Sequence, residues 1–378
     1  MRVLKWLDHY AAALTEPAFD GAVFSSAADY QARNSLSKRI WLRAKRDLVM
    51  FFTLQLPLVR KCMPPDAKRI LYVYLGTPNL GDSIMDLSPR TLWAERGLRV
   101  DMYTNEVIAS LYKNDPSFNQ IIVDPKELAS DYDFIVLQSY SWRCLKFKWR
   151  NYLLKPFSSL HGHYYGCEFN RLDYSEAAWR SVMCLPAAEA SEKCVAIFNL
   201  SVDHSRGKLA TREKNKIALA VGGVVDWRTY TNWSEVIEKV VQRLPEVEWV
   251  LIGSENGMAD AQVIEKTLDT KITNLVCQLP LNDVFRKLQD VSLLVASDGG
   301  LMNVGRAAAV PIVALFAREI HPRMRFAEEG SVYVIHAPNE VSDISPGDIA
   351  EAVISSLKNP SQQLIERYLG SEPVCSKW

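Results

Sequence analysis

Short apolar runs, separated by longer polar or amphipathic segments, recur along most of the chain after residue 65. The runs are rich in valine, isoleucine and leucine, and several end abruptly at glycine. Continuous apolar runs of this length are typical of strands buried on both faces of a parallel sheet, and the segments between them are long enough for helices. The pattern therefore predicts an α/β fold with parallel sheets. The predicted strands are 69–75, 100–103, 121–123, 134–138, 217–221, 248–252, 291–296 and 312–316.

The stretch 291–317 predicts a strand, a glycine turn, a short helix and a second strand. The first strand ends at Ser297, Asp298 and the pair Gly299–Gly300, and a helix is expected from about Leu301. Glycines let a backbone approach a ligand closely, and a helix start presents unpaired N–H groups and partial positive charge. Such a turn suits a phosphate group. The alternative is a turn inside a buried strand–helix–strand unit that binds nothing.

The loop after the first predicted strand has the spacing of a nucleotide-phosphate loop but not its charge. Gly76, Gly81 and Ser83 are correctly spaced, whereas Asp82 occupies the position of the lysine. A carboxylate repels a triphosphate, so this loop is not expected to bind one. A carboxylate at the carboxyl end of a parallel strand is better suited to remove a proton. The alternative is that Asp82 only caps the helix expected at 84–96.

Composition and charge exclude several classes of function. The 378 residues are enough for two domains, and 44 lysines and arginines balance 44 acidic residues, so no net charge favours a nucleic-acid partner. Seven cysteines, an odd number without a CxxC pair, favour reduced thiols. No apolar run reaches the roughly 18 residues needed to span a bilayer, and Asp8 and His9 interrupt the apolar N-terminus, so no signal peptide is expected. These features predict a cytoplasmic location.

Residues 1–65 precede the first predicted strand and contain a basic amphipathic segment. Apolar residues from Ile40 to Phe52 follow helical spacing, and basic residues cluster near both ends of the segment. A basic amphipathic helix can lie on an anionic membrane, so residues 38–63 would give peripheral contact with the inner membrane. The alternative is a helix whose phenylalanine-rich face packs on its own domain.

Two of these motifs together resemble glycosyltransferase family 9, the ADP-heptose:lipopolysaccharide heptosyltransferases. The stretch from Asp298 to Pro311 is similar to the family signature Asp-(Ser/Thr)-Gly-(Leu/Pro)-x-His-x-x-Ala-Ala-x-x-x-Pro, with Gly299 in place of the hydroxyl residue and Asn303 in place of the histidine. Gly81–Asp82 matches the family's Gly-Asp pair, whose aspartate is the proposed general base. The resemblance implies a GT-B fold, in which two Rossmann-like domains face each other across a cleft, here with a helical N-terminal extension.

The resemblance also implies donor-binding residues in the second domain. Trp233 matches the tryptophan of the family's Lys-x-Trp motif, Thr231 takes the place of its lysine, and Arg228 is close enough in sequence to supply the missing cation. Glu255 is the candidate ribose ligand, and Leu279 is the candidate contact to the base. The implied donor site comprises Gly222, Arg228, Thr231, Glu255, Leu279, Asp298, Gly299, Gly300, Leu301 and Asn303, with Asp82 as the catalytic base.

No metal or bound cofactor is expected. Asp131 and Asp133 match the DxD metal motif of another glycosyltransferase class, but they precede a predicted strand instead of following one. His161 and His163 have no recognisable third ligand nearby. The nucleotide-sugar donor is therefore expected as a co-substrate and not as a resident group.

The implied organisation has five parts: a helical extension at 1–65, an acceptor-side Rossmann-like domain at 66–200, a linker at 201–214, a donor domain at 215–345, and a helical region at 346–378 that crosses back to the first domain. The implied activity is inverting, metal-independent transfer of a sugar, heptose from ADP-heptose in the first place, to a lipopolysaccharide core or a related glycolipid or oligosaccharide acceptor. Two alternatives stay open: another nucleotide-sugar and glycan on the same fold, and a degenerate binding protein that no longer catalyses transfer.

Overall fold

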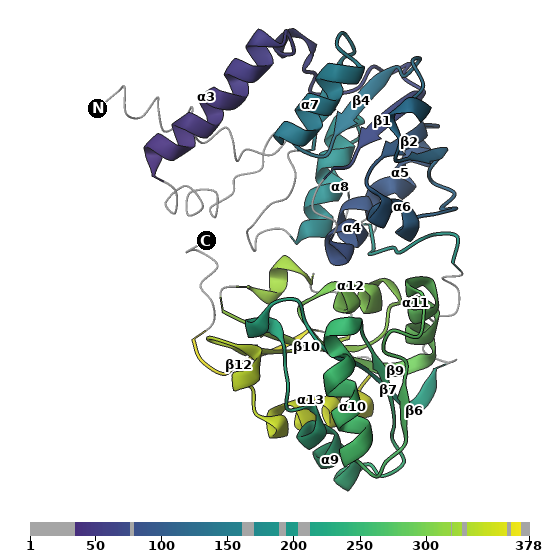
Figure 1. The fold of residues 1–378 in the computed structure, drawn as a ribbon, viewed down its shortest axis with the longest axis vertical. Helices are drawn as coiled ribbons and strands as arrows, with labels where there is room; N and C mark the ends of the chain where they lie inside the picture. Colours follow the sequence, from purple (N-terminus) through teal and green to yellow (C-terminus); the bar gives the residue numbers. More distant parts are fainter. Residues whose placement is uncertain are drawn as a thin grey trace. The chain divides into compact units, whose positions relative to one another are not determined.

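The chain forms two compact α/β units, each built on a parallel sheet (Figure 1). One unit comprises Met1–Pro78, Met85–Val195 and Val374–Trp378, and the other comprises Asn79–Ile84 and Ala196–Pro373. The predicted fold class, two parallel-sheet α/β units, is confirmed. The computed structural model describes residues 35–75, 79–160, 170–188, 194–202, 212–318, 320–326, 331–360 and 364–371.

The first sheet has five parallel strands in the order β3-β2-β1-β4-β5. The chain adds β2 and β3 on one side of β1 and then places β4 on its other side, so the strand order reverses between β1 and β4. Such a reversal opens a crevice at the carboxyl ends of the two strands, where α/β sheets bind ligands. The strands are β1 Arg69–Val73, β2 Arg99–Tyr103, β3 Gln120–Ile122, β4 Phe134–Leu137 and β5 Phe157–Ser159.

The single helix predicted at 84–96 is divided into two. α4 begins at Leu80 and ends at Leu87, and a 3-10 turn at Ser88–Thr91 leads into the short α5 at Leu92–Glu95. Pro89 explains the break, because proline disfavours helical geometry at the preceding residue and supplies no N–H. The other helices of this part are α6 Glu106–Leu111, α7 Trp142–Asn151 and α8 Arg171–Val182.

Aromatic side chains hold β1 to the helices that cover it. The ring of Trp179 on α8 lies 5.1 Å from the rings of both Tyr72 and Trp93, edge-on to each. Pairs in this geometry contribute about 0.5–1.5 kcal/mol beyond simple burial. Not every tryptophan of this unit packs in this way, since Trp179 is fully buried while Trp142 and Trp149 on α7 are exposed.

The described part of the N-terminal extension contributes one long helix, α3 Leu36–Phe52. Its carboxyl end is anchored, because Met50 is buried in the core of the first unit and Lys148 on α7 donates to Gln55 Oε1. Burial lowers the pKa of the Lys148 amine to about 7, because burial disfavours the charged form of the amine. Among the described residues, no helix is long and apolar enough to cross a bilayer.

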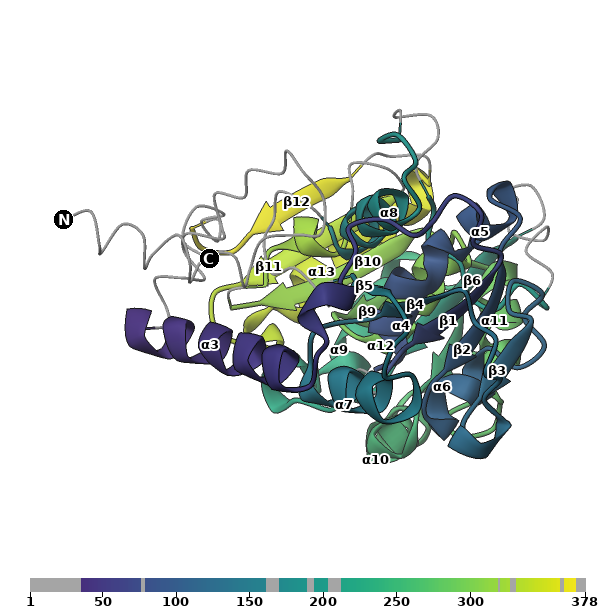
Figure 2. The same cartoon turned by 90° about the horizontal axis from the view of Figure 1, so that it is seen from above.

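The outer face of α3 is apolar and exposed. The side chains of Trp41, Leu48 and Phe52 are 62%, 50% and 76% exposed, and α3 extends away from the sheet in both views (Figures 1 and 2). The expectation that the phenylalanine-rich face packs on its own domain is therefore wrong. Met50 on the opposite face makes the core contact instead.

The cysteines depart from the expected reduced state. Cys62 and Cys184 form a disulfide, with their Cα atoms 5.8 Å apart. The backbone places them together, because the Met63 N–H donates to the Val182 carbonyl at 2.8 Å beside both cysteines. The expectation of reduced thiols is therefore wrong for this pair. Three other cysteines in the described part of the chain are free: Cys144, Cys194 and Cys277.

The second sheet has seven parallel strands in the order β12-β11-β10-β9-β6-β7-β8. The strand order reverses between β6 and β9, which are neighbours although two strands separate them in sequence. The strands are β6 Glu213–Ala220, β7 Glu248–Ile252, β8 Ile272–Asn274, β9 Val291–Ser297, β10 Ile312–Ala317, β11 Val332–Ala337 and β12 Ile365–Tyr368. The helices are α9 Trp233–Arg243, α10 Met258–Thr267, α11 Leu281–Asp290, α12 Gly300–Ala307 and α13 Pro346–Lys358.

The described part of the C-terminal region, up to residue 371, is not helical throughout as expected. α13 packs on α9 and on β9 to β11 within the second unit. Residues 365–368 form the edge strand β12 beside β11, and not a helix. The β-branched Ile365 pairs with Tyr333, and Arg367 reaches back to Asp348 on α13. Unpaired backbone groups at the edge of β11 are satisfied by this added strand.

Candidate functional site

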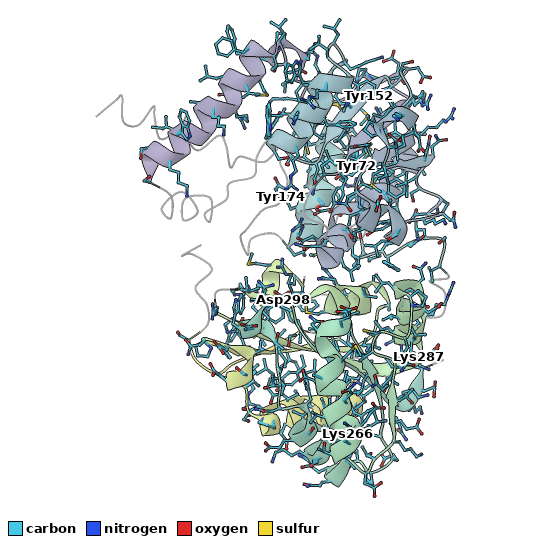
Figure 3. The ribbon with its side chains drawn as sticks, viewed as in Figure 1. Tyr72, Tyr152, Tyr174, Lys266, Lys287 and Asp298 are labelled. Carbon is cyan, nitrogen blue, oxygen red and sulfur yellow. A yellow bond between two sulfur atoms is a disulfide. The ribbon has the colours of Figure 1, made fainter. Side chains whose placement is uncertain are left out.

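Loops at the carboxyl edge of the second sheet carry most of the predicted donor residues. Gly222 follows β6, Glu255 follows β7, Leu279 follows β8 and Asp298 follows β9. Because β6 and β9 are neighbours at the reversal of strand order, the Gly222 and Asp298 loops flank the crevice in which such sheets bind ligands. Figure 3 marks Asp298 near the start of α12.

Asp298 is a buried carboxylate with one arginine on each of its oxygen atoms. Its Oδ2 lies 3.2 Å from Nη1 of Arg228, in the loop after β6. Its Oδ1 accepts a hydrogen bond from Nε of Arg325 at 3.1 Å, in the segment after β10. The three charges therefore come from three adjacent strands, β10, β9 and β6. Asp298 is 7% exposed, and a carboxylate so far removed from water requires such partners.

Arg228 is the cation that the sequence suggested for this loop, and the structure brings it to Asp298. Its guanidinium carbon lies 4.4 Å from the centre of the Trp227 ring, a cation–π contact that orients the side chain. The Nε atom of Arg228 is buried and has no hydrogen-bond partner in the described part of the chain. Arg228 therefore keeps donor capacity for a ligand.

Sequence reasoning does not single out Arg325. Three arginines, Arg318, Arg323 and Arg325, lie within eight residues after β10, and nothing in their spacing indicates which one turns toward the sheet edge. Of the three, Arg325 is the one that contacts Asp298 in the structure. Nη1 of Arg306 on α12 donates to the Arg325 carbonyl, which holds this segment against the helix. The local density of arginines is the signal that could have drawn attention to it.

The start of α12 offers further donors. The helix begins at Gly300, one residue before the predicted start, and Gly299 is its N-cap. The Gly299 backbone is extended, a conformation that any residue adopts, and a Cβ there would meet only the Ser297 carbonyl at 3.6 Å. Asn303 donates from Nδ2 to the Gly299 carbonyl at 3.1 Å, while its buried Oδ1 has no partner among the described residues. The fold does not require glycine at 299, so the missing side chain leaves room at the helix start.

Gly222 has a structural reason to be glycine. Its φ is +82°, and a Cβ would lie 2.6 Å from the backbone nitrogen of Gly257 in the loop after β7. The two loops pack backbone to backbone at this point. An alanine would be strained by the positive φ and by the close contact of its Cβ. This packing accounts for the glycine without a ligand, so a donor contact at Gly222 stays a prediction.

Asp82 lies in the first turn of α4, at the reversal of strand order in the first sheet. It is the third residue of the helix and half-buried, and its Oδ2 accepts from Nδ2 of Asn79 at 3.3 Å. The Asn79 carbonyl accepts the first helical hydrogen bond, from Ser83, so the capping position belongs to Asn79. Asp82 is therefore not the N-cap residue, and its role as a base stays a prediction.

One helical turn beyond Asp82, a buried network joins α4 to α8. The two oxygens of Asp86 each accept a hydrogen bond of 2.7 Å from Arg171, and the Tyr74 hydroxyl donates to Asp86 at 3.1 Å. Burial and the Asp86 carboxylate raise the pKa of Tyr74 well above its usual value, so its hydroxyl stays a donor. Asp86 lines a cavity of about 10 Å³, room for about one water, together with Tyr72, Gln138, Leu160, Tyr174 and Ser175. Figure 3 labels Tyr72 and Tyr174 of this set.

The acidic and histidine motifs do not form a metal centre in the described residues. Asp133 accepts hydrogen bonds from the backbone of Lys68 and Arg69 at 2.8 Å each, and Asp131 pairs with the Arg69 guanidinium at 2.6 Å. The His161–His163 pair lies outside the described part of the chain. Within that part, no group of three histidine, cysteine or acidic side chains could hold a metal ion.

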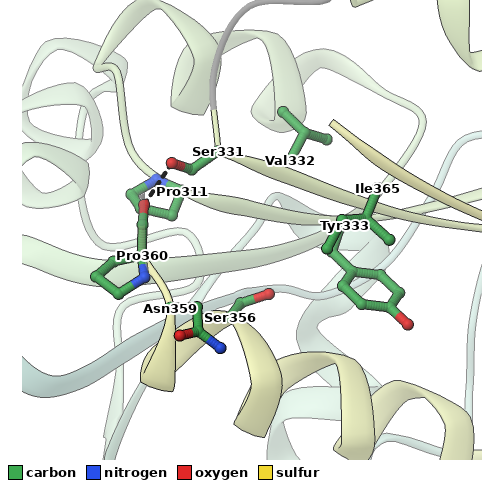
Figure 4. Close-up of a pocket in the computed structure, with 8 residues that line it drawn as sticks. All are labelled: Pro311, Ser331, Val332, Tyr333, Ser356, Asn359, Pro360 and Ile365. Atoms are coloured by element: carbon green, nitrogen blue, oxygen red, sulfur yellow. Dashed lines mark hydrogen bonds between the residues drawn. The ribbon is translucent and has the colours of Figure 1, made fainter. Parts of the chain in front are cut away.

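A hollow at the opposite, amino edge of the second sheet is not a comparable site. It measures about 10 Å³ and lies between Pro311, Ser331, Tyr333 and Asn359, and the Ser331 hydroxyl donates to the Pro360 carbonyl across it (Figure 4). Ligands of parallel α/β sheets bind at the carboxyl edge, and this hollow holds about one water.

The sequence of the second unit matches a known family. The profile described as glycosyltransferase family 9 (heptosyltransferase) matches residues 181–343, a range that contains Arg228, Asp298 and Arg325. The matched residues make up less than half of the chain, and no curated protein matches it by sequence. The match supports a glycosyltransferase.

Solved structures with the same fold include a family 9 glycosyltransferase and two heptosyltransferases. A family 9 glycosyltransferase from Veillonella parvula is 15% identical, with a TM-score of 0.63 over 79% of this chain and 99% of that chain. ADP-heptose lipopolysaccharide heptosyltransferase II of E. coli is 18% identical, with a TM-score of 0.58 over 78% and 100%. The E. coli heptosyltransferase WaaC with ADP is 14% identical, with a TM-score of 0.58 over 77% and 98%. At such identities the likeness establishes the fold alone.

The remaining predicted donor residues lie on the same edge of the second sheet but outside the Asp298 cluster. Thr231 and Glu255 are exposed on the loops after β6 and β7. Leu279 and Leu301 are half-buried, before α11 and in the first turn of α12. Their contacts to ribose, base or phosphate stay predictions.

Proposed function

We propose that the protein transfers a sugar, heptose from ADP-heptose in the first instance, to a lipopolysaccharide core or a related glycolipid or oligosaccharide acceptor. The observation that carries this proposal is the Asp298 cluster, where two arginines and a helix start converge at the carboxyl edge of the second sheet. A nucleotide diphosphate is the ligand class that such a surplus of positive charge suits. Two proteins of this fold are heptosyltransferases by name, one of them described with ADP.

The proposed reaction is a single displacement with inversion at the sugar's anomeric carbon. Asp82 would take the proton of the acceptor hydroxyl as its oxygen bonds to that carbon, while the bond from the carbon to the diphosphate oxygen breaks. Arg228, the N–H groups at the start of α12 and Asn303 would stabilise the departing diphosphate. The chemistry needs no metal, because these donors supply the positive charge. It requires the Asp82 loop and the Asp298 loop to share one cleft, which is part of the proposal.

A panel of nucleotide-sugars tests the donor. We expect ADP-heptose to raise the melting temperature more than UDP-, GDP- or CMP-sugars, because a ligand at a hundred times its dissociation constant adds about 2.7 kcal/mol to the folded state. Transfer to a lipopolysaccharide-core acceptor is then followed by mass spectrometry. A stronger shift with another nucleotide-sugar would favour the same fold with a different donor, for which the departures at Gly299, Thr231 and Asn303 leave room. No shift with any of them, in a folded protein, would favour a degenerate binding protein.

We also propose that α3 rests on an anionic membrane, at its cytoplasmic face. Residues 35–61 contain seven lysines and arginines and one acidic residue, although the whole chain is neutral. Trp41, Leu48 and Phe52 are seven and four positions apart, so they share one face of α3, and each is at least half exposed. Exposed aromatic and aliphatic side chains beside surplus positive charge match the boundary of an anionic bilayer.

Sedimentation with lipid vesicles tests this surface. We expect binding to phosphatidylcholine vesicles that contain phosphatidylglycerol, weakening with salt, and little binding without the anionic lipid. The double variant Trp41→Ser and Phe52→Ser should lose most of this binding. Leu154→Ser is the matched control, because Leu154 is equally exposed but lies after α7, outside α3. Equal binding by the double variant and the wild type would exclude α3 as the contact.

A further inference from the structure

The Asp298 cluster carries more positive charge than its own carboxylate neutralises. Arg228 and Arg325 both pair with Asp298, and their side chains are only 28% and 14% exposed. Two guanidinium groups against one carboxylate leave a net charge of one at a site where water is largely excluded. Partly desolvated charge is costly unless it is paired, so the cluster as it stands favours the arrival of an anion.

Both guanidinium groups keep hydrogen-bond donors that Asp298 does not use. A guanidinium has five N–H donors in a planar fork. Arg325 contacts Asp298 through Nε, so this carboxylate does not use its two terminal nitrogens. Arg228 pairs through Nη1 and leaves a buried Nε unpartnered. These donors lie on both sides of the carboxylate, one set from the β6 side and one from the β10 side.

A second observation concerns the start of α12, where Asn303 has a buried polar atom without a partner among the described residues. Asn303 is 3% exposed, its amide nitrogen holds the Gly299 carbonyl at the start of α12, and its Oδ1 has no partner in the described residues. A buried amide oxygen without a partner costs about 1–3 kcal/mol, which a ligand hydroxyl group could offset. Asn303 therefore marks the helix start beside Asp298 as a place where a polar ligand completes the structure.

We propose that Arg325 is a second diphosphate ligand, which holds the donor from the side opposite to Arg228. Asp298 pairs with both guanidinium groups, through Oδ2 with Arg228 and through Oδ1 with Arg325. This inference rests on the proposed function, since it assumes a nucleotide diphosphate at this edge. In this assignment Arg325 joins Arg228 in distinguishing a diphosphate from a monophosphate. A guanidinium can bind phosphate through two parallel hydrogen bonds, so it selects for the geometry of the phosphate as well as for its charge.

Calorimetric titration with ADP and AMP tests the assignment. We expect wild-type protein to bind ADP more tightly than AMP. Arg325→Gln should weaken ADP binding about tenfold to a hundredfold and change AMP binding far less, because a hydrogen bond to a charged group is worth about 1.5–3 kcal/mol. Arg325→Lys should recover part of the loss, since it restores charge without the fork. Arg323→Gln is the matched control, because Arg323 is exposed two residues earlier in the same segment.

The outcomes separate the two proposals. If the wild type binds ADP and Arg325→Gln binds it equally well, or loses ADP and AMP by the same factor, the role of Arg325 is wrong and the proposed function stands. If the wild type binds neither ADP nor the diphosphates of uridine, guanosine and cytidine, the proposed function fails and the inference with it. Melting temperatures of both Arg325 variants within a few degrees of the wild type confirm that folding is not the cause.

Discussion

Asp82→Asn is expected to lower the rate of sugar transfer by about 10²–10⁴-fold, the usual contribution of a general base. Asparagine keeps the size of the side chain and its contact with Asn79 but does not accept the acceptor's proton. Donor binding should be unchanged, because Asp82 belongs to the loop after β1 and the donor residues follow the strands of the other sheet. Single-turnover assays with saturating donor measure the effect, and calorimetry with the nucleotide diphosphate checks the binding.

Glu106→Gln is the control for this variant. Glu106 is also an acidic residue in the first turn of a helix that follows a strand of the same sheet, since α6 follows β2. It is exposed and lies away from the reversal between β1 and β4, so its replacement should leave the rate unchanged. Near-full transfer by Asp82→Asn, with the control equally active, would remove Asp82 from the mechanism.

Arg171→Met is expected to destabilise the first unit by about 3–5 kcal/mol, the cost of leaving a buried charge without its partner. Asp86 is 5% exposed at its side chain and receives both of its short hydrogen bonds from Arg171. The double variant Asp86→Leu and Arg171→Met should recover much of this loss, since it removes both charges together. Urea unfolding followed by tryptophan fluorescence suits the measurement, because Trp93 and Trp179 lie in the same core.

Arg286→Met provides the comparison. Arg286 pairs with Asp283 on α11, but both side chains are more than 40% exposed. Solvent screens such a pair, so its loss should cost no more than about 1 kcal/mol. A similar small effect for Arg171→Met would mean that water reaches Asp86 readily, and the network would then not hold α4 and Asp82 in place.

Local periodicity was sufficient for the eight strands that it predicted, but it did not indicate β5, β8, β11 or β12. The run at 248–252 is apolar, short and bounded by polar residues, and it forms β7 over those residues. β9 and β10 likewise coincide with their predicted runs to within one residue. A strand buried on both faces needs apolar side chains at consecutive positions, and such a run is visible in the sequence.

The ends and the type of some segments were less predictable, because they depend on single residues such as proline and on the elements that pack beside them. Pro89 ended α4 at Leu87 inside a pattern that otherwise continued as helix. Residues 365–368 became a strand because β11 offered an unpaired edge, although the segment had been expected to be helical. The exposed face of α3 is a similar case, since the same spacing suits a core and a surface.

The sequence by itself determined the fold class, the glycine turn before α12 and the acidic residue after β1, because each depends on residues next to one another. Only the tertiary structure decided which distant charges meet. Arg325 reaches Asp298 across 27 positions and Arg171 reaches Asp86 across 85, and both pairs follow from the order in which strands and helices are laid side by side. Burial then strongly favours these pairs, because a charge removed from water is costly unless it is paired.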